Sequence, residues 1–243
     1  MDGTSAKFDK YADNYSESLK NDLRKFGKHV GSAKIYKAQL LKHILNGEPG
    51  SILDFGCEVG LNIPYLREQF KNTKLYGCDV SPASVEIAKK NYPYCDFNVI
   101  NNAADLQEYK DVDCVFISTV LHHIPESEHK NWINGLHTIL SRNGGTLVVF
   151  EHNMKNPLTR SIVKGADADD ITMMLDPKYC KRLLLNTFYG TKAGGRGITL
   201  VKDAVKSRYT YFFPQRNKLF TMIESMLTWL PLGAQYCVYA RKQ

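Results

Sequence analysis

Strand-like and helix-like segments alternate through about a hundred residues of this chain, and this alternation limits its fold more than any other feature. Short apolar runs predict five strands, at residues 51–55, 74–79, 96–100, 112–117 and 145–150. Longer stretches with apolar residues three and four positions apart predict helices between them, at 62–70, 83–91 and 132–140. Neighbouring parallel strands need a crossover, so this order predicts a parallel sheet with helices on both faces.

The flanking regions add helices before this core and strands after it. Residues 8–45 have a helical period, which ends at Gly47, Pro49 and Gly50. Residues 156–200 look helical and irregular, and two late strands are predicted at 208–213 and 235–240. The predicted fold is therefore a Rossmann-like, doubly wound α/β domain. Its seven-stranded sheet is mostly parallel, with helices on both faces and a C-terminal antiparallel edge strand.

We expect one domain over 1–243, because no linker or repeat divides the chain. Its expected parts are an N-terminal helical cap, a ligand-binding core, a helical insertion over the substrate and the closing strands, at residues 1–47, 50–155, 156–205 and 206–243.

The composition narrows the functional classes. No apolar run approaches the roughly 18 residues of a membrane span, and the first ten residues lack the apolar stretch of a signal peptide. The six cysteines show no C-x-x-C spacing, so we interpret them as buried thiols in a reducing compartment and expect no metal site. These features predict a cytoplasmic protein.

The net charge of +7 is spread along the chain without a dense basic run. A dispersed charge is typical of a solvated surface, so we do not expect nucleic acid as the partner. It still favours anionic acceptors slightly, through the field of the whole protein.

Candidate binding residues follow the first two strands. Ligands of open α/β sheets bind at the carboxyl ends of the strands. In this chain the first strand ends in Asp54-Phe55-Gly56-Cys57-Glu58-Val59-Gly60. Gly56 and Gly60 allow a tight turn, and the next helix presents free amide groups. Asp79 ends the second strand 25 residues after Asp54, where a carboxylate can accept hydrogen bonds from ribose hydroxyls.

Two other nucleotide-binding motifs are absent. The G-x-G-x-x-G of nicotinamide and flavin proteins is not present, since Glu58 occupies the second glycine position and Gly60 is out of register. No glycine is followed by Lys-Ser or Lys-Thr, so there is no P-loop either.

The chain resembles the class I S-adenosylmethionine-dependent methyltransferases of the small-molecule type. Residues 54–60 resemble their D-x-G-x-G-x-G loop, with Glu58 in place of the middle glycine. Four further segments match in order: Phe8 to Tyr15, Asp79-Val80-Ser81, Ser118 to Ile124, and Gly144-Gly145-Thr146-Leu147. The resemblance covers about residues 8–155 and, more loosely, the closing strands.

This resemblance implies S-adenosylmethionine as cofactor, S-adenosylhomocysteine as product and a set of binding residues. Gly56, Cys57 and Gly60 are expected along its methionine and ribose, with Asp54 supporting the ammonium group. Asp79 is expected to hold the ribose hydroxyls. Val80 and Asn102-Ala103 are expected around the adenine, Ser118 at the methionine end, and Tyr15 closing over it.

Methyl transfer from a sulfonium is an in-line displacement, so the protein mainly aligns the reactants and excludes water. A hydroxyl acceptor also needs a base within hydrogen-bond reach. The candidates are His122 and His123 after the fourth strand, and Glu151 and His152 after the fifth. We predict His152 first and His122 second.

Two alternatives to a small-molecule or lipid methyltransferase stay open. One is an RNA, DNA or protein methyltransferase, which salt-sensitive binding to nucleic acid would distinguish. The other is a non-catalytic binding domain on the same fold, if the Glu58 side chain closes the cofactor site. We interpret Glu58 as tolerated and pointing away. The sequence does not identify the acceptor or the oligomeric state.

Overall fold

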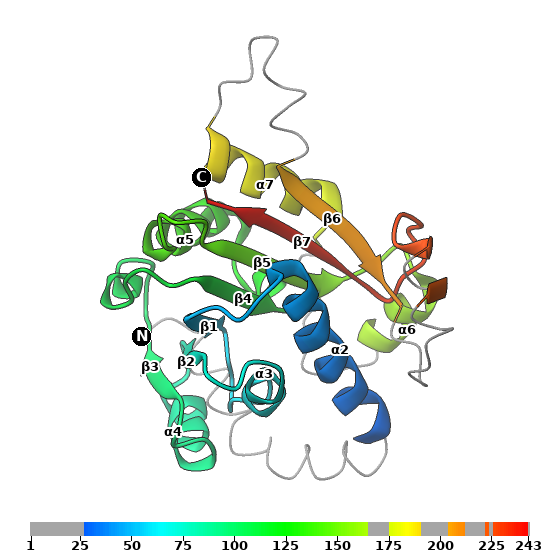
Figure 1. The fold of residues 1–243 in the computed structure, drawn as a ribbon. Coiled ribbons are helices and arrows are strands. Elements are labelled where there is room, and N and C mark those ends of the chain that lie inside the picture. Colours follow the sequence, from blue (N-terminus) through cyan, green and yellow to red (C-terminus); the bar gives the residue numbers. More distant parts are fainter. Residues whose placement is uncertain (1–26, 165–174, 191–203, 212–221, 224–225, 243) are drawn as a thin grey trace.

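A computed structural model describes residues 27–164, 175–190, 204–211, 222–223 and 226–242. They form a seven-stranded sheet in the order β3-β2-β1-β4-β5-β7-β6, which confirms the predicted fold class (Figure 1). The strands are β1 Ser51–Phe55, β2 Lys74–Asp79, β3 Asp96–Val99, β4 Cys114–Ser118, β5 Thr146–His152, β6 Val205–Thr210 and β7 Gln235–Arg241. The α-helices of the described residues are α2 Gly27–Leu45, α3 Ile63–Gln69, α4 Pro82–Asn91, α5 Glu126–Ile139, α6 Pro157–Lys164 and α7 Pro177–Tyr189.

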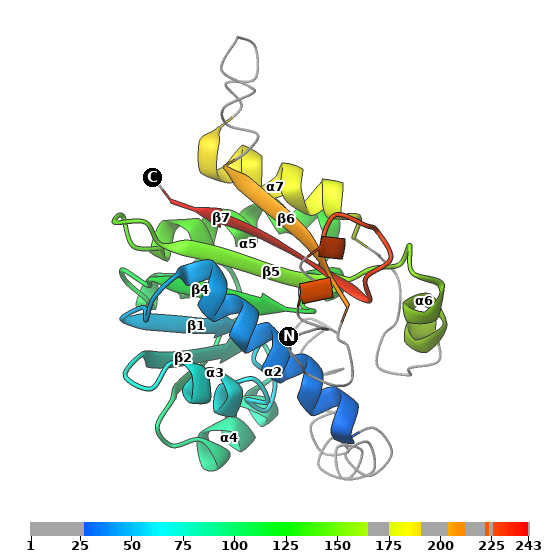
Figure 2. The ribbon, with the colours of Figure 1, turned by 45° about the vertical axis from the view of Figure 1, so that its right-hand side comes forward.

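Helices cover both faces of the sheet, as Figures 1 and 2 show. On one face, Leu41 of α2 and Leu66 of α3 belong to the same buried cluster as Phe116 of β4. On the other face, Leu136 of α5 and Leu184 of α7 belong to a second cluster. Two apolar layers against one sheet are what a doubly wound parallel sheet requires, because its strands are buried on both sides.

The first five strands are parallel, whereas β7 runs antiparallel between β5 and β6. In the pairing of β5 with β7, His152 lies opposite Gln235, so β7 begins at the end of the sheet where β5 finishes. The carboxyl ends of β1, β2, β4 and β5 therefore lie at the same end of the sheet as the start of β7, and the predicted site residues lie at this end.

Some predicted boundaries need correction. The helix expected at 132–140 is α5, Glu126–Ile139. The prediction missed its first turns because they are polar and show no apolar period. The strand expected at 208–213 is β6, displaced toward the N-terminus because Val205 pairs with Ala240 and Thr210 with Gln235. Residues 212–213 and the predicted helical residues 8–26 lie outside the described residues.

Ser81 caps α4. Its hydroxyl accepts a hydrogen bond from the Ser84 amide at 3.1 Å, and Pro82 occupies the first turn. Within the described ranges, no helix is both long enough and apolar enough to cross a membrane.

Candidate functional site

The loop after β1 is held against β2 and needs its glycines. The amides of Gly56 and Cys57 both donate to the Cys78 carbonyl, at 2.8 and 3.0 Å. Gly56 has φ +71°, and a Cβ there would come within 2.5 Å of Val120. Gly60 has φ +82°, and a Cβ there would come within 2.7 Å of Tyr92. A side chain at either position would therefore clash as well as strain the backbone.

Glu58, between these glycines, also adopts a left-handed backbone with φ +50°. The residue is exposed, and its amide donates to Oδ2 of Asp79 at 2.8 Å. This conformation strains the backbone of any residue other than glycine. The loop therefore keeps the path that glycine would adopt, and its amide still points at Asp79.

Asp79 is oriented by backbone donors. Besides Glu58, the Ser81 amide donates to its Oδ1 at 3.0 Å. Burial raises the pKa of this carboxyl to about 6, although the bonds from Ser81 and Glu58 oppose the shift. Each carboxylate oxygen has a second lone pair, so Asp79 can accept further hydrogen bonds from a ligand.

Asp54 is fully buried under the same loop. Asn62 donates to both of its oxygens, at 3.4 and 3.2 Å. Burial raises the pKa of Asp54 to about 7, and neither the Asn62 bond nor the positive charge of Lys34 offsets it. The charge of this group therefore changes near neutral pH.

Two lysines of α2 face this region, and the sequence analysis missed both. The Nζ of Lys37 donates to the Ser118 hydroxyl at 2.8 Å and lies 5.7 Å from the centre of the Phe150 ring. Burial and the nearby Lys34 lower the pKa of Lys37 to about 7. Burial also lowers the pKa of Lys34, against the attraction of nearby carboxylates. Lysines in an amphipathic helix usually face solvent, so no local signal distinguishes these two.

Glu151, at the end of β5, holds the loop that follows β4. Its Oε1 accepts the amides of Val120 and Leu121 at 3.1 and 2.8 Å, and its Oε2 lies 2.7 Å from Nδ1 of His122. Burial alone would raise the pKa of Glu151, but the hydrogen bond and charge of His122 lower it overall. Glu151 is therefore an ionised acceptor that positions the loop, and it is poorly placed to act as a base.

The histidines of the sheet edge lie together. The ring of His122 is 4.0 Å from that of His123 and 5.5 Å from that of His152, centre to centre. His122 is buried, whereas His152 is half-buried and has Nδ1 3.4 Å from Nε2 of Gln235. Among the described residues, no group of three or more histidine, cysteine or acidic side chains is arranged to hold a metal ion.

The other predicted binding residues are distributed around the same edge. Cys57 is buried beside the glycine turn, and burial raises the pKa of its thiol. Val80 and Ala103 pack against the core cluster that includes α5. Asn102 is exposed and its side chain organises the turn after β3, accepting the Ala104 amide at 2.8 Å. Tyr15 lies outside the described residues.

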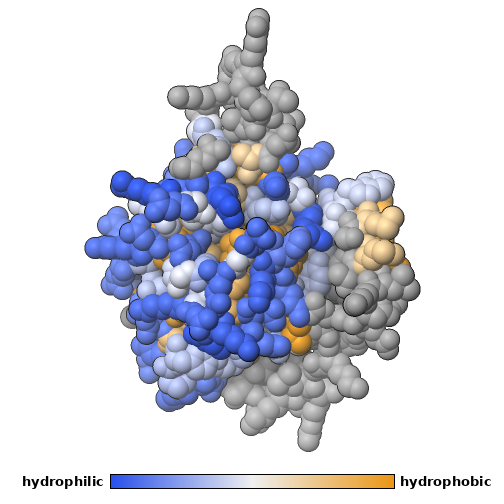
Figure 3. Space-filling view, in the orientation of Figure 1, coloured by the Kyte–Doolittle hydropathy of each residue, from blue (hydrophilic) through white to orange (hydrophobic). Residues whose placement is uncertain are grey.

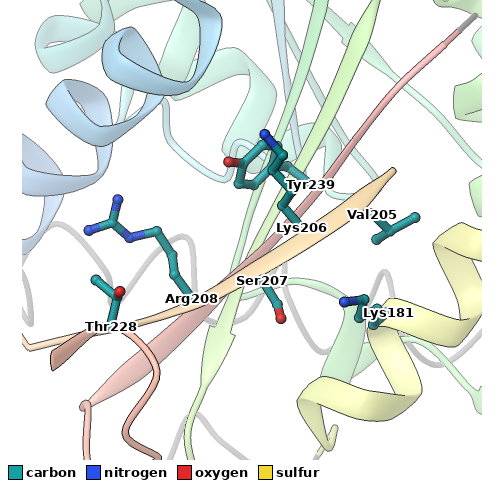
Figure 4. Close-up of a pocket in the computed structure, with 7 residues that line it drawn as sticks. All are labelled: Lys181, Val205, Lys206, Ser207, Arg208, Thr228 and Tyr239. Atoms are coloured by element: carbon teal, nitrogen blue, oxygen red, sulfur yellow. The ribbon is translucent and has the colours of Figure 1, made fainter. Parts of the chain in front are cut away.

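A separate cavity of about 380 Å³ lies at the far edge of the sheet (Figure 4). It is lined by Lys181, Val205, Lys206, Ser207, Arg208, Thr228 and Tyr239. None of the predicted site residues lines this cavity, because the loops that carry them follow β1, β2, β4 and β5. We therefore place the candidate site at the carboxyl ends of β1, β2, β4 and β5.

Comparison with known proteins identifies the kind of domain that carries this edge. Residues 52–144 match a family model described as a methyltransferase domain. The trans-aconitate 2-methyltransferase of Enterobacter sp. (strain 638) is 28% identical over 123 residues, which cover 49% of this chain and 46% of that protein. The tRNA N(3)-methylcytidine methyltransferase of Schizosaccharomyces pombe is 28% identical over 171 residues, 63% of this chain and 67% of that protein. The chain thus spans about half the length of the trans-aconitate methyltransferases that it matches.

Solved structures share the fold over nearly the whole chain. A SAM-dependent methyltransferase from Archaeoglobus fulgidus superposes with a TM-score of 0.62 at 15% identity, covering 93% of this chain and 99% of that one. The plantazolicin methyltransferase BamL, solved with SAH, superposes with a TM-score of 0.61 at 20% identity, covering 99% and 97%. At such identities the likeness concerns the fold.

Proposed function

We propose that this chain, a member of the class I S-adenosylmethionine-dependent methyltransferase family, transfers a methyl group from S-adenosylmethionine to a small-molecule or lipid acceptor. One observation carries the proposal. The glycine loop after β1 and the carboxylate at the end of β2 are joined by the 2.8 Å bond from the Glu58 amide to Asp79. That bond fixes the loop and the ribose acceptor relative to each other, despite the missing glycine.

The charges at this edge fit S-adenosylmethionine. Its ammonium and sulfonium groups are cationic, and Asp54 and Asp79 provide buried carboxylates on the side of β1 and β2. Its carboxylate is anionic, and Lys34 and Lys37 provide positive charge on the side of α2. A buried charge requires a compensating partner, so these groups suit a ligand that carries both signs.

When bound, S-adenosylmethionine supplies the electrophilic methyl group, and the chain's own residues align the acceptor with it. Glu151 holds the amides after β4 in place, which fixes the wall next to Ser118. We assign the role of base for a hydroxyl acceptor to His152, because it ends β5 at the candidate site and is only half-buried. His122 is buried and bonded to Glu151, so it is the second candidate.

Calorimetric titration with S-adenosylhomocysteine tests the cofactor site. We expect micromolar binding to the intact protein, weakened about 30-fold or more in Asp79→Ala, since a charged acceptor is lost and two backbone donors are left unpaired. The loop also loses its anchor, so the thermal transition of the variant is recorded as a control. No binding to the folded, unaltered protein would refute the enzyme and support a non-catalytic binding domain.

The base is tested by His152→Ala. If His152 takes a proton from the acceptor, kcat falls about 100-fold while the affinity for S-adenosylhomocysteine stays unchanged. His43→Ala, at an exposed histidine of α2, serves as the control, and equal turnover in both variants would remove the assignment.

The relatives offer two acceptor classes to assay. Three of the matching curated proteins are named trans-aconitate 2-methyltransferases, and a small anionic acid suits a site next to the buried Lys37. A tRNA acceptor is the second candidate, because the tRNA methyltransferase aligns over the longest stretch of this chain among these relatives. Transfer of labelled methyl to trans-aconitate, or instead to bulk tRNA with a steep salt dependence, separates the two.

We also propose a cytoplasmic location. All six cysteines are free and buried, which suits a compartment that keeps thiols reduced.

A further inference from the structure

The exposed large apolar side chains of the described residues are concentrated in one place. Six such side chains are more than half-exposed or close to it, and all but Tyr94 lie on α6 or within residues 222–232. These five are Leu158, Met222, Met226, Trp229 and Leu232, with exposed fractions of 70, 56, 66, 72 and 57%. We call this set the apolar rim. Figure 3 shows a small apolar patch at the right-hand margin, where Figure 1 draws the orange-red segment that precedes β7.

The two parts of the rim are tied together by asparagine side chains. Nδ2 of Asn156 donates to the Leu232 carbonyl at 2.5 Å, and its Oδ1 accepts the Leu158 amide at 2.9 Å. Nδ2 of Asn153 donates to the carbonyls of Pro231 and Gly233, at 2.9 and 2.7 Å. The start of α6 and residues 231–233, which carry Leu158 and Leu232 of the rim, are therefore held next to each other.

The backbone beneath the rim is hydrogen-bonded internally. The Tyr211 hydroxyl donates to the carbonyls of Leu227 and Leu230, at 2.9 and 2.8 Å. The Tyr209 amide donates to the Thr228 carbonyl, and the Thr159 hydroxyl to that of Ala234. With the asparagine bonds, seven carbonyls between 227 and 234 have partners within the chain. A segment that satisfies its own acceptors can leave water at low cost.

We propose that the apolar rim docks the protein on the surface of a lipid bilayer that contains anionic headgroups. Tryptophan, methionine and leucine side chains on a backbone with satisfied acceptors match the boundary between headgroups and acyl chains. The net charge of +7 attracts an anionic surface and repels a second copy of this chain. Arg160 is also exposed on α6, so the helix that carries Leu158 carries a cation as well.

Docking in this way would bring the candidate site close to the bilayer. Asn153, which ties residues 231 and 233 to α6, directly follows His152 at the end of β5. The rim is therefore built on the same end of the sheet as the cofactor loop. Docking does not depend on which acceptor is methylated, since binding to vesicles requires neither cofactor nor turnover.

Tryptophan fluorescence measures this docking directly. The chain has two tryptophans, and Trp132 is only 6% exposed, so a change of environment reports Trp229. Vesicles of phosphatidylcholine mixed with phosphatidylglycerol should shift the emission to the blue and carry the protein into the pellet on sedimentation. Vesicles of phosphatidylcholine alone should do so more weakly.

Substitutions in the rim provide the decisive comparison. Met226→Ser and Trp229→Ser together should weaken partitioning to the anionic vesicles about 100-fold, since each side chain contributes about tenfold. Tyr94→Ser, at the exposed aromatic outside the rim, should leave partitioning unchanged. The proposal is overturned if the intact protein does not bind anionic vesicles, or if the double variant binds them equally well. It is also overturned if the protein forms a dimer that the double variant abolishes, without vesicle binding.

Discussion

The region around the loop after β1 and the region around α6 use their polar side chains in opposite ways. Around β1, β2 and α2, Asp54, Asp79 and Lys37 are buried and keep hydrogen-bonding capacity for a ligand. Around α6 and residues 226–234, the side-chain amides of Asn153 and Asn156 donate their hydrogen bonds to backbone carbonyls. Buried charge without full compensation is costly, so it indicates a ligand, whereas satisfied carbonyls beneath exposed apolar side chains indicate a surface.

Glu151 lies between these regions, and its loss should give the largest effect on stability. Glu151→Ala leaves the amides of Val120 and Leu121 and the buried His122 without their acceptor, and we expect the free energy of unfolding to fall by about 3–5 kcal/mol. Glu151→Gln should cost less, since the amide oxygen can still accept the two backbone bonds.

Denaturant unfolding measures this effect. Glu86→Ala is the control, because it removes only an exposed pair with Lys89, which is worth about 0–1 kcal/mol. A similar loss in both variants would mean that Glu151 does not hold the loop after β4.

Asn153→Ala tests the second region alone. The buried Gly233 carbonyl and the Pro231 carbonyl lose their donor, so we expect a loss of about 1–2 kcal/mol in stability. The affinity for S-adenosylhomocysteine should stay the same, in contrast to Asp79→Ala. Asn131→Ala, at an exposed position of α5, is the control for the asparagine substitution. A large change in cofactor affinity in Asn153→Ala would show that the two regions are coupled.

The pH dependence of cofactor affinity sharpens the electrostatic half of the comparison. The pKa of Lys37 is lowered to about 7, so its amine loses its charge, and its attraction for a carboxylate, as the pH rises through 7. The pKa of Asp79 is raised to about 6, so this acceptor is lost as the pH falls through 6. The pKa of Asp54 is raised to about 7, so its negative charge is also lost as the pH falls below 7. We therefore expect affinity to be greatest near pH 7 and to decline by up to about tenfold per unit for each titrating group on either side.

Calorimetry of Lys37→Met tests the alkaline side of this profile. The variant should bind more weakly at neutral pH and lose the decline above pH 7, while keeping the decline below pH 6. Lys42→Met, at an exposed residue of the same helix, should keep both. An unchanged alkaline decline in Lys37→Met would assign it to another group.

The smallest expected effect concerns Glu58. Glu58→Gly relieves a left-handed backbone and should raise stability by about 1 kcal/mol or less, because part of the gain is lost to the more flexible unfolded chain. Asn46→Gly, at φ 53°, should gain less, since asparagine tolerates this region. Thermal unfolding of both variants measures the difference, and a loss of stability in Glu58→Gly would show that its side chain contributes a needed contact.

Sequence patterns were reliable where the cause is local. The β–α alternation predicts the sheet, because strand and helix periods are properties of consecutive residues. The same holds for Gly56 and Gly60, since a tight turn with positive φ restricts the residue type at that position. Helix α5 was predicted too short because its first turns carry no apolar period, which is the signal that the prediction used.

The sequence by itself determined the sheet, the loop after β1 and the position of Asp79 at the end of β2. Only the tertiary structure decided that Lys37 meets Ser118, 81 residues further along, and that Glu151 meets His122, 29 residues before it. It also decided that Leu158 and Leu232 share one exposed surface. These contacts depend on which faces the folded sheet brings together, and side-chain pairing over such separations leaves no mark in local spacing.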